Sequence, residues 1–409
     1  MELRPILSTL SRHKTAAALI VFEIALSCAI VCNALFLIAG RLERIDRPTG
    51  VDEQHVVTLQ ARGLATDTSA DAVTQTDLAA LRAVPGVANA TISVQVPFGN
   101  SNWNSSVRMT PDQRGETMNA SNYIGDEHFI DTMGLELVAG RNFTRDEVGD
   151  FGRMRAEGAV HFPAVILTRA TAERLFPAGD ALGKPLYIWG EEPSRVIGIV
   201  ERLVKPNDSG SAASYGESVL LPGRVPYSSG SYLVRVNDPA QRDAVLEQAR
   251  EALIAQGPTR IVDAEQARTL ESMRDRYYRQ DRAMAWMLVA VIVALLVVTA
   301  LGIVGLASFW VQQRSRQIGI RRALGATRGQ ILRYFQTENF LLATIGIVIG
   351  MLLAYALNQL LMQRYELPRL PLFYLPIGAV VLWLLGQVAV YGPARRAALV
   401  PPAVATRGA

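Results

Sequence analysis

The sequence predicts a membrane protein with four transmembrane α-helices and a large α+β extracytoplasmic domain between the first and second helices. Half of the 409 residues are apolar, and the mean hydropathy is positive. The apolar residues gather in four runs, each about as long as the ~20 residues that cross a bilayer. Between the first two runs lies a long segment of mixed composition, which is enough chain for a hydrophobic core of its own.

The four apolar runs set the boundaries of the predicted segments. The first run is not expected to be a cleaved signal peptide, because Arg41, Glu43 and Arg44 follow it in place of small residues. In chain order we expect a cytoplasmic N-terminus over 1–15, a first transmembrane helix over 16–40, an extracytoplasmic domain over 41–282, a second helix over 283–311, a cytoplasmic loop over 312–336, a third helix over 337–362, a fourth helix over 371–392 and a cytoplasmic tail over 393–409.

The positions of Lys and Arg predict the orientation in the membrane. Outside residues 41–282 there are 14 basic residues, and 12 of them lie before the first span, between the second and third spans, or after the fourth. Because short cytoplasmic segments are enriched in Lys and Arg, these three segments are expected in the cytoplasm. Residues 41–282 carry 27 basic and 33 acidic side chains. The net positive charge of the chain therefore reflects its topology and does not predict nucleic-acid binding.

The external domain begins and ends with the pattern of a split βαβ fold. The predicted elements are a strand over 56–59, a helix over 74–84, a strand over 87–96, a strand over 231–236, a helix over 239–255 and a strand over 259–262. Asp238 and Pro239 are residue types that begin helices. Two such units form a ferredoxin-like layer, here with an inserted subdomain over about 98–219. Residues 100–106 and 207–214, rich in Gly, Asn and Ser, are expected to be exposed loops.

Residues 263–282 are predicted to form a stalk helix that continues into the second span. No proline interrupts residues 263–311, and the first glycine is Gly302. Leu270, Met273 and Tyr277 recur at helical spacing, a stripe suited to packing against another helix. One continuous helix of this length would extend about 70 Å at 1.5 Å per residue. A lever that moves the outer domain and a simple support both fit this pattern.

The loop between the second and third spans has the most distinctive sequence of the chain. Residues 317–330 read Gln-Ile-Gly-Ile-Arg-Arg-Ala-Leu-Gly-Ala-Thr-Arg-Gly-Gln. Gly325 is expected to end a short helix, and Thr327 with Gln330 to begin the next one through a capping box. Its chemistry alone fits two partners, a soluble protein or anionic lipid at the membrane surface. The apolar side of the short helix comprises Ile318, Ile320 and Leu324, and its basic side Arg316, Arg321 and Arg322.

Two polar side chains, Glu23 and Asn33, lie within the first span. An ionisable group in lipid is costly unless it is paired or faces protein. We expect both side chains to face protein, with Glu23 either snorkelling towards the cytoplasmic surface or paired to Lys14 or Arg12. A role of Glu23 in an ion path is the alternative.

The sequence contains no motif of enzyme chemistry. The four histidines are scattered, and neither HExxH nor G-x-S-x-G occurs. Residues 179–184 lack the glycine spacing of a phosphate loop. Cys28 and Cys32, both inside the first span, are expected to be small packing residues, so the external domain has no disulfide. No catalytic residue, cofactor or metal site is predicted.

Residues 317–330 resemble, nearly residue for residue, the cytoplasmic loop of the FtsX/MacB-like family of ABC transporter permeases. The resemblance extends along nearly the whole chain, although Pro401 and Pro402 depart from the ending common in that family. Five further segments resemble the MacB-like periplasmic core domain, at 129–134, 138–143, 175–177, 182–184 and 195–200. The segment 391–398 in the tail also resembles the family.

The resemblance implies the permease subunit of an ABC transporter, with no fused ATPase in this sequence. MacB itself carries its ATPase at the N-terminus, whereas no Walker A motif occurs here. We therefore expect a separate ABC ATPase subunit that binds ATP and Mg²⁺. Other implied partners are a second permease in a homodimer or heterodimer, membrane lipids, and a periplasmic adaptor with an outer-membrane channel. The residues implied to couple to the ATPase are Ile318, Arg321, Arg322, Leu324, Gly325 and Arg328.

The implied function is mechanotransmission at the bacterial inner membrane, in which ATP hydrolysis changes the conformation of the periplasmic domain for export or efflux. One alternative is an FtsX-like regulator of a periplasmic cell-wall hydrolase, which also needs an ATPase. Another is a membrane-anchored sensor without an ATPase. Only the sensor predicts that charge reversal at Arg321 and Arg322 changes nothing.

Overall fold

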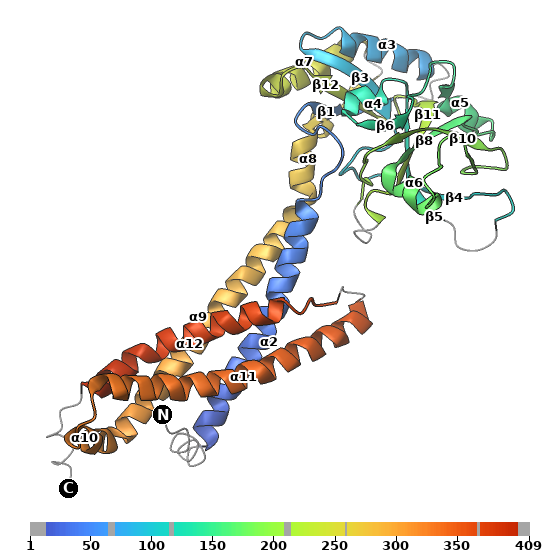
Figure 1. The fold of residues 1–409 in the computed structure, drawn as a ribbon. Coiled ribbons are helices and arrows are strands. Elements are labelled where there is room, and N and C mark those ends of the chain that lie inside the picture. Colours follow the sequence, from blue (N-terminus) through green and yellow to red (C-terminus); the bar gives the residue numbers. More distant parts are fainter. Residues whose placement is uncertain are drawn as a thin grey trace. The chain divides into compact units, whose positions relative to one another are not determined.

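The computed structural model describes residues 14–63, 70–113, 118–207, 214–257, 260–365 and 369–399. The chain divides into two compact units. We call Met1–Asp46 with Gln280–Ala409 the helical unit, and Arg47–Arg279 the α+β unit (Figure 1).

The helical unit is built from four long apolar helices, each long and apolar enough to cross a membrane. This confirms the number of spans predicted from the sequence. A short fifth helix, α10, joins the second and third long helices. The long helices are α2 (Lys14–Ile45), α9 (Arg279–Gln313), α11 (Arg328–Tyr365) and α12 (Tyr374–Ala398), and α10 spans Ser315–Ala323.

Small residues bring α2 close to α11 and α12. A Cβ added to Gly350 of α11 would lie 2.5 Å from the Cβ of Cys28, and one added to Gly378 of α12 would lie 2.5 Å from the Sγ of Cys32. Gly346, four residues before Gly350, faces α2 in the same way. Both cysteines are fully buried. They are small packing residues, as predicted, in a helix contact of the kind that glycines permit in membranes.

The first sheet of the α+β unit has the strand order of a ferredoxin-like fold. Its order is β14-β1-β12-β3, which is what two interleaved βαβ units produce. The predicted fold class is therefore confirmed. The strands are β1 (Val56–Leu59), β3 (Val87–Ser93), β12 (Ser231–Val236) and β14 (Arg268–Thr269), and the helices are α3 (Ala70–Arg82) and α7 (Arg242–Ala255), the latter preceded by the 3₁₀ turn η2 (Pro239–Gln241).

The predicted closing strand was assigned to the wrong sheet. Its described part, β13 (Arg260–Val262), pairs antiparallel with β2 (Ala61–Gly63) in a separate ribbon. β2 follows β1 almost directly, so β13 meets this continuation of β1 and not β1 itself. The chain then returns through the 3₁₀ turn η3 (Ala264–Gln266), and β14 takes the edge beside β1.

The continuous helix predicted from residue 263 is also wrong. α8 begins only after β14 and spans Leu270–Tyr277, and Tyr278 interrupts the helix before α9 begins. Thr269 supplies the start signal, because its Oγ1 accepts a hydrogen bond from the Ser272 N–H at 3.1 Å. The apolar stripe packs onto the sheet instead of a second helix, since Met273 Sδ lies 3.4 Å from Thr58 Oγ1.

The insertion forms a second, eight-stranded sheet, which confirms the predicted subdomain. The last strand of the insertion in chain order extends to Arg224, beyond the predicted end at about residue 219. Residues 104–106, which were predicted to be a loop, belong to the edge strand of this sheet. Most of the other predicted loop, 208–213, lies outside the described residues. The order is β4 (Asn104–Val107), β5 (Met118–Gly125), β11 (Ser218–Arg224), β8 (Ala164–Thr168), β10 (Ser194–Val200) and β6 (Leu137–Gly140), with β7 (Gly149–Asp150) on β11 and β9 (Pro185–Leu186) on β10; the short helices are α4 (Phe129–Met133), α5 (Phe151–Ala156) and α6 (Arg169–Leu175).

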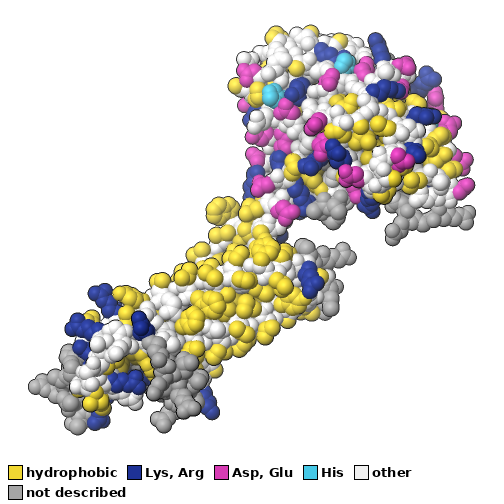
Figure 2. Space-filling view, viewed as in Figure 1, with side chains coloured by type: hydrophobic (Ala, Val, Ile, Leu, Met, Phe, Trp, Pro, Cys, Tyr) yellow, Lys and Arg dark blue, Asp and Glu magenta, His cyan; other side chains and the backbone are white. Residues whose placement is uncertain are grey.

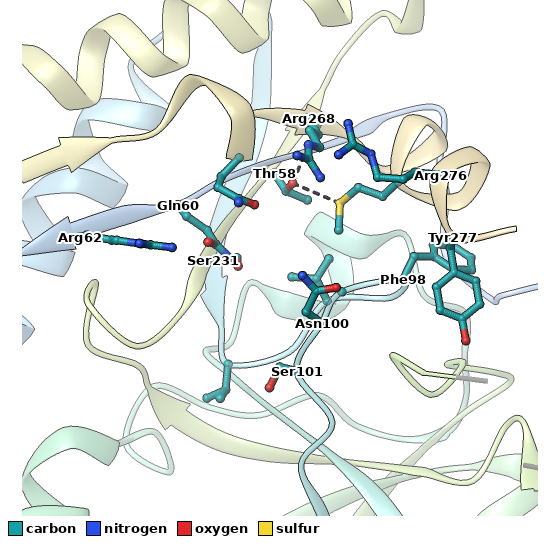
Figure 3. Close-up of a pocket in the computed structure, with 15 residues that line it drawn as sticks. Thr58, Gln60, Arg62, Phe98, Asn100, Ser101, Ser231, Arg268, Arg276 and Tyr277 are labelled. Carbon is teal, nitrogen blue, oxygen red and sulfur yellow. Dashed lines mark hydrogen bonds between the residues drawn. The ribbon is translucent and has the colours of Figure 1, made fainter. Parts of the chain in front are cut away.

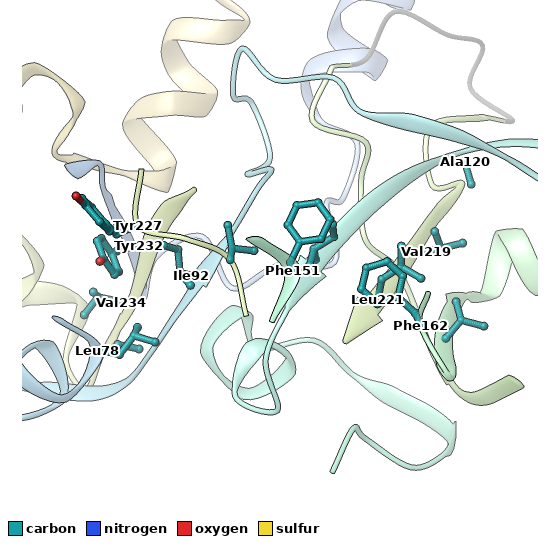
Figure 4. Packing of buried hydrophobic residues seen from close by; sticks show 14 of the residues in the cluster. Leu78, Ile92, Ala120, Phe151, Phe162, Val219, Leu221, Tyr227, Tyr232 and Val234 are labelled. Atoms are coloured by element: carbon teal, nitrogen blue, oxygen red, sulfur yellow. The ribbon is translucent and has the colours of Figure 1, made fainter. Parts of the chain in front are cut away.

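One hydrophobic core joins the two sheets of the α+β unit (Figure 4). Leu78 and Val234 contribute from the ferredoxin-like layer, and Phe162 and Leu221 from the inserted sheet. Phe151 lies between these groups in Figure 4, and its ring centroid is 6.3 Å from that of Phe162. The two cysteines of the chain lie in α2, so this core stabilises the unit without a disulfide.

One surface ion pair of the α+β unit strongly perturbs an acid. Arg141 Nη1 and Nη2 donate to the two carboxylate oxygens of Glu147 at 2.8 and 2.7 Å. The Thr144 N–H donates to the same carboxylate at 3.0 Å. These hydrogen bonds, that from Arg141 first, lower the pKa of Glu147 to about 2.

Candidate functional site

The short helix α10 ends in a defined cap. Gly325 has a φ of +99°, a conformation that glycine adopts without strain. Its N–H donates to the Arg322 carbonyl at 3.1 Å, and the Ala326 N–H donates to the Arg321 carbonyl at 3.0 Å. This pair of bonds is the Schellman motif, so the predicted cap at Gly325 is confirmed.

The next helix begins with the predicted capping box. The Thr327 N–H donates to Gln330 Oε1 at 2.9 Å, and the Gln330 N–H lies 3.3 Å from Thr327 Oγ1. Each side chain thus satisfies a backbone donor that the first turn of α11 would leave free. Two adjacent caps fix a sharp corner between α10 and α11.

Ile318 is the residue that anchors α10 to the rest of the helical unit. Its side chain is 5% exposed and belongs to a small buried cluster with Val311 of α9, Phe335 of α11 and Ala394 of α12. One side chain therefore links three of the long helices at this corner.

The grouping of Ile318, Ile320 and Leu324 on one side of α10 was wrong. Ile320 and Leu324 are 49% and 83% exposed, whereas Ile318 is buried. Residues two apart on an α-helix point about 200° away from each other, so Ile318 and Ile320 cannot share a face. The corner consequently presents two apolar side chains outward, next to the exposed cations Arg316 and Arg328.

The remaining basic residues of α10 are held more closely. The Arg321 guanidinium lies 5.1 Å from the centroid of the Tyr334 ring in α11. Arg322 is half-buried. Figure 2 shows Lys and Arg side chains gathered at the end of the helical unit that carries α10, while hydrophobic side chains cover its visible flank.

The sequence analysis missed a buried ion pair near this corner. Arg314, between α9 and α10, donates from Nη1 to both carboxylate oxygens of Glu338 in α11 at 3.0 and 2.9 Å. The two side chains are only 8% and 2% exposed. The Arg314 guanidinium also lies 5.6 Å from the centroid of the Trp310 ring. An acid in an apolar run that follows a purely basic loop was the available signal.

A second ion pair joins α2 and α9 at their other ends. Arg41 Nη1 lies 2.5 Å from Asp281 Oδ1, and Arg44 Nη1 lies 3.7 Å from Oδ2. Asp281 is 8% exposed. Both ends of α9 are therefore tied by ion pairs, to α11 at one end and to α2 at the other.

The two polar residues predicted within the first span both face helices. The Glu23 carboxylate lies against α9, where a Cβ added to Gly302 would be 2.3 Å from Oε2. Asn33 Nδ2 donates to the Ala354 carbonyl of α11 at 3.1 Å. Among the ion pairs of the described residues none joins Glu23 to Lys14, which lies about 13 Å away along α2 at 1.5 Å per residue. Arg12 lies outside the described residues.

Nothing at this corner suggests a resident metal. Within the described ranges, no group of three or more His, Cys, Asp or Glu side chains could hold a metal ion. The capped corner carries exposed apolar side chains, and buried contacts lead from it into α9, α11 and α12.

Comparison with known proteins gives two family matches. Residues 289–402 match the FtsX-like permease C-terminal family, and residues 17–252 match the MacB-like periplasmic core domain family. The second match alone covers more than half of the chain.

Several individual proteins are similar to the chain. The macrolide export ATP-binding/permease protein MacB of Chromobacterium violaceum is 29% identical over 314 residues, which cover 71% of this chain and 43% of that protein. The protein of the same name from Acinetobacter baylyi is 24% identical over 411 residues, 98% of this chain and 58% of its own. The chain thus spans about half the length of the curated relatives it matches. The periplasmic region of MacB from Actinobacillus actinomycetemcomitans matches 58% of this chain and 97% of its own, with 16% identity and a TM-score of 0.33.

Proposed function

The chain belongs to the family of ABC transporter permeases that combine a MacB-like periplasmic core domain with an FtsX-like permease domain, and we propose that it couples an ABC ATPase to movement of its extracytoplasmic domain. It is a membrane protein whose α+β unit is extracytoplasmic. α9 separates that unit from α10, so α10 is on the cytoplasmic side. We further propose that the membrane is a bacterial inner membrane and that the α+β unit is periplasmic.

The observation that carries the proposal is the outward face of α10. Leu324 is 83% exposed on a helix whose position is fixed by two caps and by the buried Ile318. Exposed apolar side chains on a rigid element, next to cations, are typical of a protein interface. The proposed occupant is the ATPase, in a separate subunit that binds ATP and Mg²⁺, and Arg321, Gly325 and Arg328 complete the contact surface or hold its shape.

Force applied to α10 has a direct path into the membrane helices. The Ile318 cluster carries it to α11 and α12, and the Arg314–Glu338 ion pair joins the end of α9 to α11. At the far end of α9, Asp281 passes the displacement to α2 through Arg41. Since α2 and α9 flank the α+β unit in the sequence, this path supports mechanotransmission from ATPase to extracytoplasmic domain.

The helical unit also suggests a second permease. Along α9, apolar side chains such as Val293, Val298 and Leu301 are 54 to 66% exposed. Lipid covers such a surface in a monomer, and a second permease covers part of it in the proposed homodimer or heterodimer. Relatives named for macrolide export lead us to propose export or efflux as the outcome of the movement, with an adaptor as a further partner.

Co-purification from native membranes tests the docking proposal. The tagged chain is compared with Leu324→Asp and with Arg321→Glu/Arg322→Glu, and bound proteins are identified by mass spectrometry. Leu399→Asp is the matched control, because Leu399 is 51% exposed at the end of α12 and lies outside α10. We expect an ATPase with the unaltered chain and the control, and its loss with the α10 variants.

Two results would contradict the proposal. If the well-folded unaltered chain retains no ATPase, the hypothesis of a membrane-anchored sensor would be favoured. An ATPase retained by both α10 variants would move the docking surface away from α10. An adaptor recovered by cross-linking supports export, and a cell-wall hydrolase recovered in its place supports the regulator.

A further inference from the structure

A cavity of about 750 Å³ lies in the α+β unit, on the face of the ferredoxin-like sheet that the core helices leave open (Figure 3). Val57 and Leu59 of β1 belong to the core with residues of α3 and α7, whereas Thr58 between them lines the cavity. Side chains alternate between the two faces of a strand, so the cavity lies on the opposite face from α3 and α7. Its volume is within the range of small-molecule sites.

Three arginines from three elements line this cavity. They are Arg62 of β2, Arg268 of β14 and Arg276 of α8. β14 pairs with β1 so that Arg268 aligns with Thr58, which is why an edge strand of two residues is enough to place a guanidinium here. Figure 3 shows the side chains of Arg268 and Arg276 near Thr58 and that of Arg62 beyond Gln60.

Within the described part of the chain, none of these three arginines forms an ion pair with a carboxylate. Glu265 lines an adjoining hollow that shares Arg268 and Arg276, and its side chain is exposed. Guanidinium groups gathered in this way match a phosphate or a carboxylate, which they bind through paired charge-assisted hydrogen bonds.

Apolar side chains form part of the cavity wall, and one of them belongs to a strained residue. They are those of Val96, Phe98, Met273 and Tyr277. Phe98 has a φ of +62° and is the one non-glycine residue with positive φ in the described chain. Its N–H donates to the Pro206 carbonyl at 3.1 Å, which fixes this conformation. A bulky residue held at positive φ is uncommon and is often found at binding sites.

Neutral polar groups also line the cavity. Gln60 Nε2 donates to Ser231 Oγ at 2.9 Å, and both side chains line the cavity together with Asn100 and Ser101. A few polar groups in a partly apolar cavity are what orient a small ligand.

We propose that this cavity binds an organic anion, with its phosphate or carboxylate at the arginines and its apolar body against Phe98. Three cations exclude a cationic ligand by repulsion, and the apolar wall favours an amphipathic anion over a simple inorganic ion. The site lies within the α+β unit and does not depend on an ATPase, so its test is separate from that of the docking surface.

Isothermal titration calorimetry on the full chain in lipid nanodiscs tests the site. The probe is 1-naphthyl phosphate, compared with inorganic phosphate and with 1-naphthol, and empty nanodiscs give the baseline for partitioning into lipid. We expect saturable binding of one 1-naphthyl phosphate per chain. Inorganic phosphate lacks the apolar body and 1-naphthol lacks the anion, so both are expected to bind at least about tenfold more weakly.

Two single variants assign the binding to this cavity. Arg268→Gln and Arg62→Gln are each expected to weaken the binding of 1-naphthyl phosphate about tenfold or more, since each removes charge-assisted hydrogen bonds. Arg145→Gln is the control, because Arg145 is an exposed arginine of the same unit that does not line the cavity. Arg62 is also exposed, so its variant keeps the test valid if Arg268→Gln does not fold.

Three results would overturn the proposal. One is the absence of saturable 1-naphthyl phosphate binding by the folded full chain. Another is equal weakening by the control variant, which would indicate diffuse surface charge. The third is equal affinity for inorganic phosphate, which would remove the apolar part of the site.

Discussion

Replacing Glu338 by glutamine measures how firmly α9 is held to α11. Glu338→Gln keeps the shape of the side chain and removes the negative charge, which leaves the Arg314 guanidinium buried without its partner. The pair is 8% and 2% exposed and has two hydrogen bonds near 3 Å, so solvent screens it weakly. Removing one partner of a buried ion pair costs about 3–5 kcal/mol. We expect about 3 kcal/mol here, because the amide oxygen of glutamine still accepts one hydrogen bond.

Unfolding of the helical unit in mixed dodecyl maltoside and SDS micelles provides the assay. Three of the five tryptophans report the transition of this unit, since Trp286 and Trp310 lie in α9 and Trp383 in α12, whereas Trp103 and Trp189 lie in the α+β unit. The control is Arg333→Gln, which removes a charge from an exposed position of α11. Its expected effect is below about 0.5 kcal/mol.

A double replacement separates stability from coupling. Arg314→Met with Glu338→Leu removes both charges and is expected to recover most of the lost stability, because apolar pairs often replace buried ion pairs at little cost. If the proposed ATPase docks on α10, its ATP hydrolysis is nevertheless expected to stay uncoupled from movement of α9. The reasoning is refuted if Glu338→Gln lowers the free energy of unfolding by no more than the Arg333→Gln control does.

Three further changes have defined outcomes. Gly302→Ala should destabilise the helical unit by about 1–3 kcal/mol, because the new Cβ would lie 2.3 Å from the Glu23 carboxylate, and a second change to alanine at Glu23 should restore it. Gly350→Val should prevent folding in the same micelle assay, since its Cβ would meet α2 backbone at 2.6 Å, while Gly305→Val, with no atom within 4 Å, should be tolerated. The pKa of Glu147 is lowered from 4.5 to about 2, so its carboxylate stabilises the α+β unit above about pH 4.5, and this contribution is lost as the pH falls towards 2. Replacing it in Glu147→Gln should therefore lower the free energy of unfolding near pH 6. The free energies of unfolding of the full chain and the variant, measured between pH 2 and 6, should become equal at the acid end.

Elements with a strong local signal could be predicted from the sequence. The strands 56–59 and 231–236 have the predicted limits, since each is a short run rich in valine and leucine between turn signals. Asp238 accepts a hydrogen bond from the Ala240 N–H at 2.9 Å, and Thr327 forms its capping box with Gln330. These features depend on residues within four positions of each other, which is the range over which sequence patterns are informative.

The errors arose where distant residues decide. The strand at the edge of the main sheet is β14 and not β13, because β13 pairs with β2, the continuation of β1. The stalk helix starts late because β14 must first pair with β1. Pairings across the chain, such as Arg314 with Glu338 or Glu23 with Gly302, have no local signature. The anionic-ligand cavity was likewise invisible, since its three arginines come from separate elements.

The placement of the polar contacts on α9 fits the proposed transmission of movement through this one helix. Its 35 residues extend about 52 Å at 1.5 Å per residue, and ion pairs lie close to both ends. In its middle third, Thr299 shares a hydrogen bond of 2.8 Å with Ser27 of α2, while Val293, Val297 and Val298 are more than half exposed. A helix is stiff along its axis because its hydrogen bonds run in that direction. In the proposed mechanism, a push at α10 that displaces Arg314 therefore moves Asp281 as well, and the ATPase needs to act on one corner only.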